Sequence, residues 1–228
     1  LKESSFNKAL VIGGGPSAIK NLGFIRKNQK KYAIICVDRM FKTLVEKKII
    51  PNFVVCSDPG EHIERFKDIN IPVKSYPKLL YLPSTNFKML KLWKGKKYYY
   101  YPDDEKNMKV YRKIFNQYPG EKLFLQGSTI HPCVDLAAKL KSKEILLFGA
   151  DFCLINQQTH SSQKKNKEVI SISGYNKELL NGSGEVVKTK PSLISFLREL
   201  EFYISKNNDI TFINSSKSGA LIKGTKYL

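Results

Sequence analysis

The chain has 228 residues, 42% of them hydrophobic, which is enough for one α/β domain with a full core. Its apolar runs are far too short to span a membrane, and its first residues lack the basic and then apolar pattern of a signal peptide. Lysine and arginine number 39 against 20 acidic residues, so the net charge of +19 suits an anionic partner such as nucleic acid, a membrane surface or a phosphorylated substrate.

Arginine contributes only five of these basic residues. Proteins that read bases and phosphates usually depend on the fork of the arginine guanidinium, so we interpret much of the charge as a lysine-rich, solvated surface and expect no specific nucleic-acid partner. The remaining charge is consistent with a positive field around an anionic ligand and with peripheral contact to an anionic membrane.

The cysteines give no sign of a metal site or a disulfide framework. All four stand alone beside or inside apolar segments, at Cys36, Cys56, Cys133 and Cys153. This usage is typical of reduced core cysteines in a cytoplasmic protein. We interpret residues 1–228 as a single nucleotide-sugar-binding domain, and the start at Leu1 leaves open that it is the core of a longer protein.

In chain order, the sequence predicts strands that alternate with helices. The expected strands are Ala9–Ile12, Tyr32–Val37, Phe53–Cys56, Leu79–Leu82, Tyr98–Tyr101, Glu144–Phe148 and Ile210–Ile213. The expected helices are Arg39–Lys47, Glu105–Gln117, Ser128–Lys141 and Pro191–Lys206, with a polar loop over Asn156–Lys167. This alternation predicts an α/β fold, a doubly wound and mostly parallel Rossmann-like sheet.

The turn after the first strand is the clearest candidate for a binding site. It consists of Gly13, Gly14, Gly15, Pro16 and Ser17. Glycines let a phosphate approach the backbone closely, and Ser17 is expected to cap a helix whose N-terminus favours an anion. The turn matches neither a P-loop nor the dinucleotide fingerprint, and an ordinary strand-to-helix turn remains the alternative.

Polar residues also follow several of the other expected strands. Because ligands of a doubly wound sheet bind beyond the carboxyl ends of the strands, these residues predict a cleft at one edge. Helix capping is the alternative role for each of them. The candidates are Asp38 beside Arg39, Asp58, Gly127, Ser128, Thr129 and Asp151, and Asn214 begins a polar, glycine-containing tail that is either a further wall of the cleft or an ordinary loop.

Three histidines offer different prospects as a general base. His62 is interpreted as a surface residue early in a helix, and His131 either faces the cleft or packs. His160 lies in the polar loop after Asp151, where it is free to close over a ligand. The sequence contains no Ser-His-Asp elbow, zinc-ligand spacing or kinase signature, so we expect no resident metal.

The basic and aromatic stretch from Trp93 to Tyr101 has two interpretations. Interleaved lysines and aromatic rings are able to hold single-stranded nucleic acid. Strand propensity favours the other interpretation, a β-strand with two aromatic faces after a basic turn.

Together these motifs resemble the motility-associated factor family, the bacterial flagellin glycosyltransferases. The resemblance runs from about residue 8 to residue 225 and rests on the order and spacing of the motifs. They are Val11–Ser17, Val37-Asp38, Pro51 to Pro59 with Val54, Val55 and Asp58, Gly127-Ser128-Thr129, Leu147–Asp151, His160, and Asn214 with Gly219, Ala220, Ile222 and Gly224.

Such domains are similar to bacterial sialyltransferases, which bind CMP-sialic acid. The resemblance implies a glycosyltransferase that moves a CMP-activated nonulosonic acid to a Ser or Thr of flagellin or to a surface glycan, with no cofactor. It places Gly13–Ser17 against the CMP phosphate and Asp58, Ser128 and Thr129 near nucleotide or sugar. It also places Asp151 at the floor of the cleft, and we name His160 and Asp151 as the candidate catalytic residues.

One departure concerns the base. Those sialyltransferases carry their catalytic histidine just before the last long helix, whereas Gly184–Ser192 contains none here. Two alternatives therefore stay open. A related family resembles 6-hydroxymethylpterin diphosphokinase, in which Asp58 and Asp151 would hold magnesium for transfer from ATP. The other alternative is a nucleotide-binding module without activity.

Overall fold

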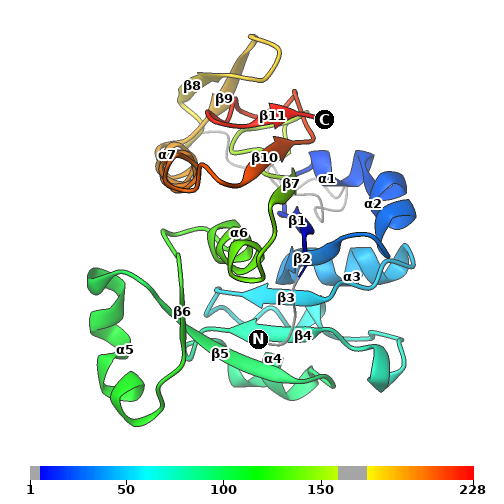
Figure 1. Ribbon diagram of the computed structural model, residues 1–228, viewed down its shortest axis with the longest axis vertical. Helices are drawn as coiled ribbons and strands as arrows, with labels where there is room; N and C mark the ends of the chain where they lie inside the picture. The colour runs from blue at the N-terminus through cyan, green and yellow to red at the C-terminus, as the bar shows by residue number, and fades with distance from the viewer. Residues whose placement is uncertain (1–5, 159–173) are drawn as a thin grey trace.

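The computed structural model describes residues 6–158 and 174–228, and nine of its strands form one parallel sheet. The strand order is β11-β10-β7-β1-β2-β3-β4-β5-β6 (Figure 1). Two further strands, β8 and β9, pair as an antiparallel hairpin. The predicted α/β, doubly wound fold is therefore confirmed.

The strands of the sheet are short and follow the apolar segments of the sequence. They are β1 Lys8–Ile12, β2 Ala33–Val37, β3 Phe53–Cys56, β4 Lys78–Tyr81, β5 Lys97–Pro102, β6 Glu121–Leu123, β7 Glu144–Phe148, β10 Thr211–Asn214 and β11 Lys226–Tyr227. The hairpin strands are β8 Lys177–Leu180 and β9 Val186–Thr189. Strand β2 is buried along its whole length, as expected for a parallel strand covered on both faces.

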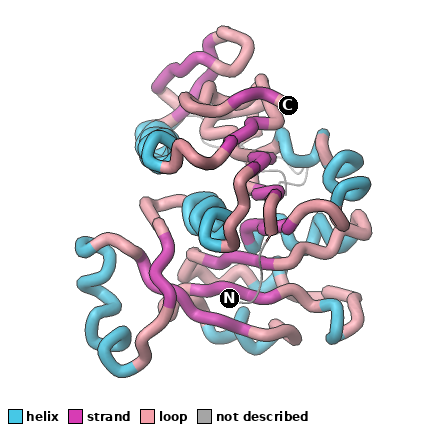
Figure 2. Tube along the Cα trace, viewed as in Figure 1, coloured by secondary structure: helices cyan, strands magenta, loops and turns pink. Residues whose placement is uncertain are grey.

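Helices lie on both sides of this sheet. They are α1 Ser17–Lys20, α2 Leu22–Asn28, α3 Asp38–Glu46, α4 Phe87–Leu92, α5 Glu105–Gln117, α6 Ile130–Lys139 and α7 Pro191–Lys206, with 3-10 turns η1 Ile63–Arg65 and η2 Val73–Ser75. Figures 1 and 2 show α1 to α3 on one side of β1 and α6 and α7 on the other. Right-handed crossovers explain the two sides. From β1 the chain adds strands in one direction, to β6, and from β7 it adds strands in the other direction, to β11.

The sequence predicted the bounds of four elements as the structure has them: β3, β7, α5 and α7. Each has a clear local signal. Asp104 caps α5 by accepting a hydrogen bond from the Asn107 amide at 2.8 Å, and Pro191 occupies the first turn of α7. The aromatic stretch forms β5, with Tyr100 and Tyr101 buried, as the strand interpretation predicted.

Two helices begin elsewhere than predicted. Helix α3 starts at Asp38 rather than Arg39, and α6 starts at Ile130 rather than Ser128. In the second case Gly127 has φ +83°, so the chain makes a left-handed turn before the helix begins. The predicted helix around His62 is only the single 3-10 turn η1. None of the helices in the described ranges is long and apolar enough to cross a membrane.

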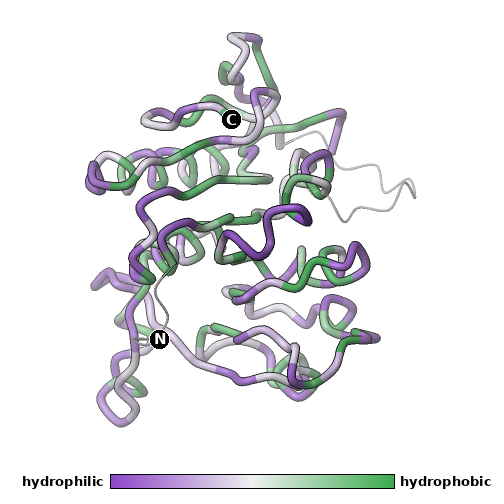
Figure 3. The backbone as a smooth tube through the Cα atoms, turned by 45° about the vertical axis from the view of Figure 1, so that its right-hand side comes forward, coloured by the Kyte–Doolittle hydropathy of each residue, from purple (hydrophilic) through white to green (hydrophobic). Residues whose placement is uncertain are grey.

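All four cysteines are free and buried, which confirms their prediction as core residues. Figure 3 shows hydrophobic residues along the central strands and hydrophilic residues at many outer turns. One part of the hydrophobic core is an aromatic cluster around the single tryptophan, Trp93. Its ring centroid lies 4.8 Å from Phe41, 5.0 Å from Phe66 and 5.4 Å from Tyr76. This aromatic cluster fastens η1 to α3.

We expect Trp93→Ala to lower the free energy of unfolding by roughly 3–5 kcal/mol, because it removes the central ring of the aromatic cluster. Urea unfolding followed by circular dichroism measures this loss. Trp93→Phe is the control, since it keeps a ring in place and should cost clearly less. Equal losses for the two variants would contradict a role in packing.

Candidate functional site

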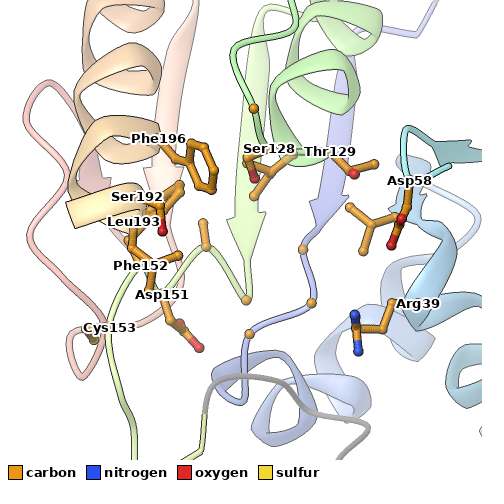
Figure 4. A pocket seen from close by; sticks show the side chains of 18 of the residues that line it. Arg39, Asp58, Ser128, Thr129, Asp151, Phe152, Cys153, Ser192, Leu193 and Phe196 are labelled. Carbon is orange, nitrogen blue, oxygen red and sulfur yellow. The ribbon is translucent and has the colours of Figure 1, made fainter. Parts of the chain in front are cut away.

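A cleft of about 280 Å³ opens at the carboxyl ends of β1, β2, β3 and β7. Most residues of the predicted site line it: Gly13, Gly14, Gly15, Asp38, Asp58, Gly127, Ser128, Thr129 and Asp151. The cleft lies where the strand order reverses, between β1 and β7, which is the usual ligand position in a doubly wound sheet. Figure 4 shows its two sides, with Arg39 and Asp58 on one and Asp151, Ser192 and Phe196 on the other.

The glycine turn is shaped by its contact with the loop after β7. The Gly13 amide donates to the Phe148 carbonyl at 2.7 Å, and the Gly15 amide donates to the Gly149 carbonyl at 2.9 Å. A Cβ on Gly13 would lie 2.6 Å from the Gly149 oxygen, and one on Gly15 would lie 2.7 Å from it. At these two positions glycine makes room for the protein's own atoms, the Gly149 carbonyl and, at Gly15, also the Asp151 carboxylate, which is a constraint that the sequence did not reveal. The approach of a phosphate to this turn stays a prediction.

Gly14 differs from its two neighbours. It is only half-buried, and its N–H has no hydrogen-bond partner in the described part of the chain. Because Gly14 lines the cleft, its amide is a candidate donor to a ligand there. The backbone hydrogen bonds of Gly13 and Gly15 hold the turn in place on either side of it.

The sequence predicted that Ser17 caps the helix that follows, and this prediction was wrong. The Ser17 hydroxyl donates to Asp151 Oδ1 at 2.5 Å and its amide to Oδ2 at 2.9 Å, while Pro16 takes the position before the helix. Burial raises the pKa of Asp151, and the hydrogen bonds from Ser17 oppose that rise. Asp151 thus joins the β7 loop to the β1 turn.

The C-terminal tail supports Asp151 from behind and does not line the cleft. The Ala220 amide donates to the Asp151 carbonyl at 2.8 Å, and Gly219 lies directly against the Asp151 backbone. Asn214 is buried at the end of β10, where its Oδ1 accepts from the Ser216 amide at 3.1 Å. The structure therefore places Asn214 outside the cleft lining, away from the other predicted residues.

Charged residues gather at the end of the cleft beside β2 and β3. Asp38 Oδ2 lies 2.5 Å from Arg65 Nη1, and Asp58 Oδ2 lies 3.4 Å from the same nitrogen. Asp58 also accepts from the Gly60 amide at 2.9 Å and pairs with His62 Nε2 at 2.7 Å. These donors hold the pKa of Asp58 below its usual value, although its partial burial acts in the opposite direction.

The sequence missed both the partnership of His62 with Asp58 and the position of Arg65. His62 was interpreted as a surface residue, yet it is half-buried and engaged. Arg65 is 27 residues from Asp38 along the chain, so no local spacing signals the pair.

The far side of the cleft is formed by α7 and the segments before it, which the sequence also missed. Lys190 directly precedes α7, and its Nζ lies 5.4 Å from the centroid of the Tyr175 ring. Ser192 and Leu193 line the cleft from the first turn, and their amides have no hydrogen-bond partner among the described residues. A helix N-terminus and a lysine therefore face the same space. Pro191 was the available signal, because it marked where this helix begins.

The turn before α6 lies between these two sides. Ser128 and Thr129 line the cleft, and neither side chain caps α6, so both hydroxyls are available to a ligand. Gly127 is the adjoining residue, and a side chain there would run into the ring of Phe196.

His131 packs instead of facing the cleft. The Gln126 amide donates to its Nδ1 at 3.3 Å, so the proton lies on Nε2, which contacts the Phe196 carbonyl at 3.0 Å. The imidazole thereby ties α6 to α7. Its burial lowers the pKa of His131 to about 4, so it stays neutral at physiological pH.

His160 lies outside the described residues, and its predicted catalytic role remains a prediction. In the described ranges, no group of three or more His, Cys, Asp or Glu side chains is arranged to hold a metal ion.

The fold and cleft define a doubly wound α/β protein with a crevice at the switch point of its sheet. The chain belongs to the family described as 6-hydroxymethylpterin diphosphokinase MptE-like, whose sequence profile matches residues 1–157. No curated protein sequence matches it.

Among solved structures, the chain is similar to the MAf glycosyltransferase from Magnetospirillum magneticum AMB-1, with a TM-score of 0.76 and 17% identity. The similarity covers 99% of this chain and 34% of that chain, so this chain spans about a third of the other's length. The predicted resemblance to the motility-associated factor domain is confirmed, and at this identity the likeness concerns the fold.

We expect Gly15→Ala to destabilise the protein by roughly 1–3 kcal/mol, because a Cβ there meets both Gly149 and Asp151. The matched control is Gly23→Ala in α2, where nothing lies within 4 Å and alanine should raise stability by about 0.4–1 kcal/mol. Thermal unfolding of both variants measures the difference. Wild-type stability in Gly15→Ala would mean that the glycine serves the ligand alone.

His131 should make the protein less stable in acid. Its folded-state pKa lies below the usual value, so the unfolded chain binds the extra proton, and stability falls as the pH drops from about 6.5 to 4. A shift of this size corresponds to up to roughly 3 kcal/mol. The free energy of unfolding against pH should therefore be flatter over this range in His131→Gln. An unchanged slope would show that other groups cause the dependence.

Proposed function

We propose that the chain is a glycosyltransferase domain that binds a CMP-activated nonulosonic sugar and transfers the sugar to a hydroxyl acceptor. The observation that carries the proposal is the set of positive groups that line one cleft: the Gly14 amide, the first turn of α7, Lys190 and Arg39. Such a set stabilises a phosphate without a metal ion. The fold likeness to a glycosyltransferase supports the reaction class.

The two sides of the cleft suit different parts of such a donor. Phe152, Tyr175 and Phe196 offer aromatic surface for a pyrimidine base beside the N-terminus of α7. Ser128, Thr129 and Asp58 offer hydroxyl and carboxylate oxygens for sugar hydroxyls. The phosphate would then lie between them, near Gly14 and Lys190.

In the proposed transfer, the acceptor hydroxyl oxygen forms a bond to the anomeric carbon of the sugar. The bond between that carbon and the phosphate oxygen breaks, and its electron pair leaves with CMP. Lys190 and the first amides of α7 are placed to stabilise the charge that develops on the phosphate. Lys190 stands just before the last long helix, the position where the similar sialyltransferases carry their histidine.

The acceptor proton needs a separate base, for which we propose His160. Asp151 lines the cleft, but both its carboxylate oxygens accept hydrogen bonds from Ser17. We therefore propose that Asp151 positions the glycine turn rather than removing the proton. Flagellin or a surface glycan is the acceptor implied by the family resemblance.

The second candidate is a magnesium-dependent diphosphokinase, which the description of the family favours. It needs carboxylates such as Asp58 and Asp151 to hold the metal. Asp151 is engaged by Ser17, and Asp58 is engaged by His62 and Gly60. These bonds occupy part of each carboxylate, and the described residues hold no group of three or more His, Cys, Asp or Glu side chains that would complete a magnesium site.

We expect calorimetry to detect binding of CMP and CMP-sialic acid without magnesium. Lys190→Ala should weaken both by about tenfold or more, because it removes a cation from the phosphate position. Lys188→Ala is the matched control, since that exposed lysine pairs with Glu178 at 2.7 Å and does not line the cleft. Magnesium-dependent binding of ATP instead would support the diphosphokinase and overturn the transferase.

A further inference from the structure

Arg39 and Arg65 both line the cleft at the end beside β2 and β3, but their surroundings differ. Arg65 is 7% exposed and contacts Asp38 and Asp58 through one nitrogen, Nη1. The two nearest carboxylates are thus already engaged by Arg65. Asp58 is bound further by His62 and Gly60.

The Arg39 side chain has neither an ion pair nor a hydrogen bond within residues 6–158 and 174–228. Its side chain is half-buried, and Figure 4 shows its guanidinium group pointing into the cleft. Burial lowers the pKa of Arg39 and repulsion from Arg65 adds to this, while the charges of Asp38, Asp58 and Glu64 act in the opposite direction. An anion in the cleft would supply acceptors to the buried part of this guanidinium group.

From this arrangement we infer that Arg39 is the binding residue for an oxyanion of the ligand, and that Arg65 is a positioning residue that holds Asp38 and Asp58 in direct contact with itself. The inference rests on the proposed function for the identity of the ligand. A guanidinium group binds the two oxygens of a carboxylate or a phosphate in one plane, which a lysine cannot do. The proposed donor carries both groups, a phosphate on the nucleotide and a carboxylate on the sugar.

Arg65 determines the charge of this end of the cleft. Three charged side chains, Asp38, Asp58 and Arg39, border the same space, and without Arg65 the two carboxylates would outnumber the one cation. Arg39 would then pair with an aspartate instead of the ligand. The aromatic cluster holds Arg65 in place, because Phe66 is the next residue and packs on Trp93.

The test is calorimetric binding of cytidine, CMP, CMP-sialic acid, free sialic acid and ATP to the wild-type chain and to Arg39→Gln. We expect a roughly ten- to hundredfold loss for the ligand whose oxyanion Arg39 binds, and no loss for cytidine. Equal losses for CMP and CMP-sialic acid identify the phosphate, and a loss confined to the sialic acid ligands identifies the carboxylate. Arg39→Lys should recover only part of the affinity.

Arg26→Gln is the control, because Arg26 is an exposed arginine on α2 and does not line the cleft. Wild-type affinity of Arg39→Gln for every ligand that the wild-type chain binds would overturn the inference. If the wild-type chain binds ATP but no cytidine ligand, the transferase proposal fails, and a loss of ATP affinity in Arg39→Gln still supports the oxyanion site. Absence of binding to all five ligands overturns both.

The role of Arg65 has its own test. Arg65→Gln should weaken oxyanion binding as Arg39→Gln does, because it frees Asp38 and Asp58 to pair with Arg39. Adding Asp38→Asn should restore much of the affinity, since it removes the competing carboxylate. A merely structural role for Arg65 predicts no such rescue, and circular dichroism and thermal unfolding check that each variant is folded.

Discussion

The close contact between the turn after β1 and the loop after β7 is the constraint on which the site depends. The sheet order places β1 and β7 side by side, and the chain leaves their carboxyl ends toward opposite faces. A crevice must form there, and its shape is set by how closely the two loops meet. Gly13 and Gly15 allow direct backbone hydrogen bonds to Phe148 and Gly149, and Asp151 ties the two loops together through Ser17.

Much of this arrangement could be predicted from the sequence, because the strands of a buried parallel sheet are continuous apolar runs. Once β1, β2, β3 and β7 are recognised, their carboxyl ends must share an edge, and the polar residues that follow them must gather there. This argument correctly brought Asp38, Asp58 and Asp151 to one cleft. It needed only the strand positions and the rule that the strands are parallel.

The partners of these residues could not be predicted in the same way. Ser17 precedes a helix and has the side chain of a cap, but a carboxylate 134 positions later competes for its donors. Arg65 and Asp38 meet because the aromatic cluster places η1 against α3. Such pairings depend on tertiary packing, which leaves no periodicity or spacing in the sequence. The positions of the aspartates along the chain therefore predicted where the cleft lies. They did not predict which basic groups neutralise the aspartates there.

That local charge bears on the reaction. The leaving phosphate of a CMP-sugar departs as an anion, so it needs positive groups more than it needs a proton, and fixed amides and cations supply these without a change of protonation state. The acceptor hydroxyl has the opposite need, a base that takes its proton. Under the proposed function the rigid cleft therefore serves the leaving group through Gly14, Lys190 and the start of α7. The base has to come from elsewhere, so the lack of a histidine before α7 affects only the acceptor half of the reaction.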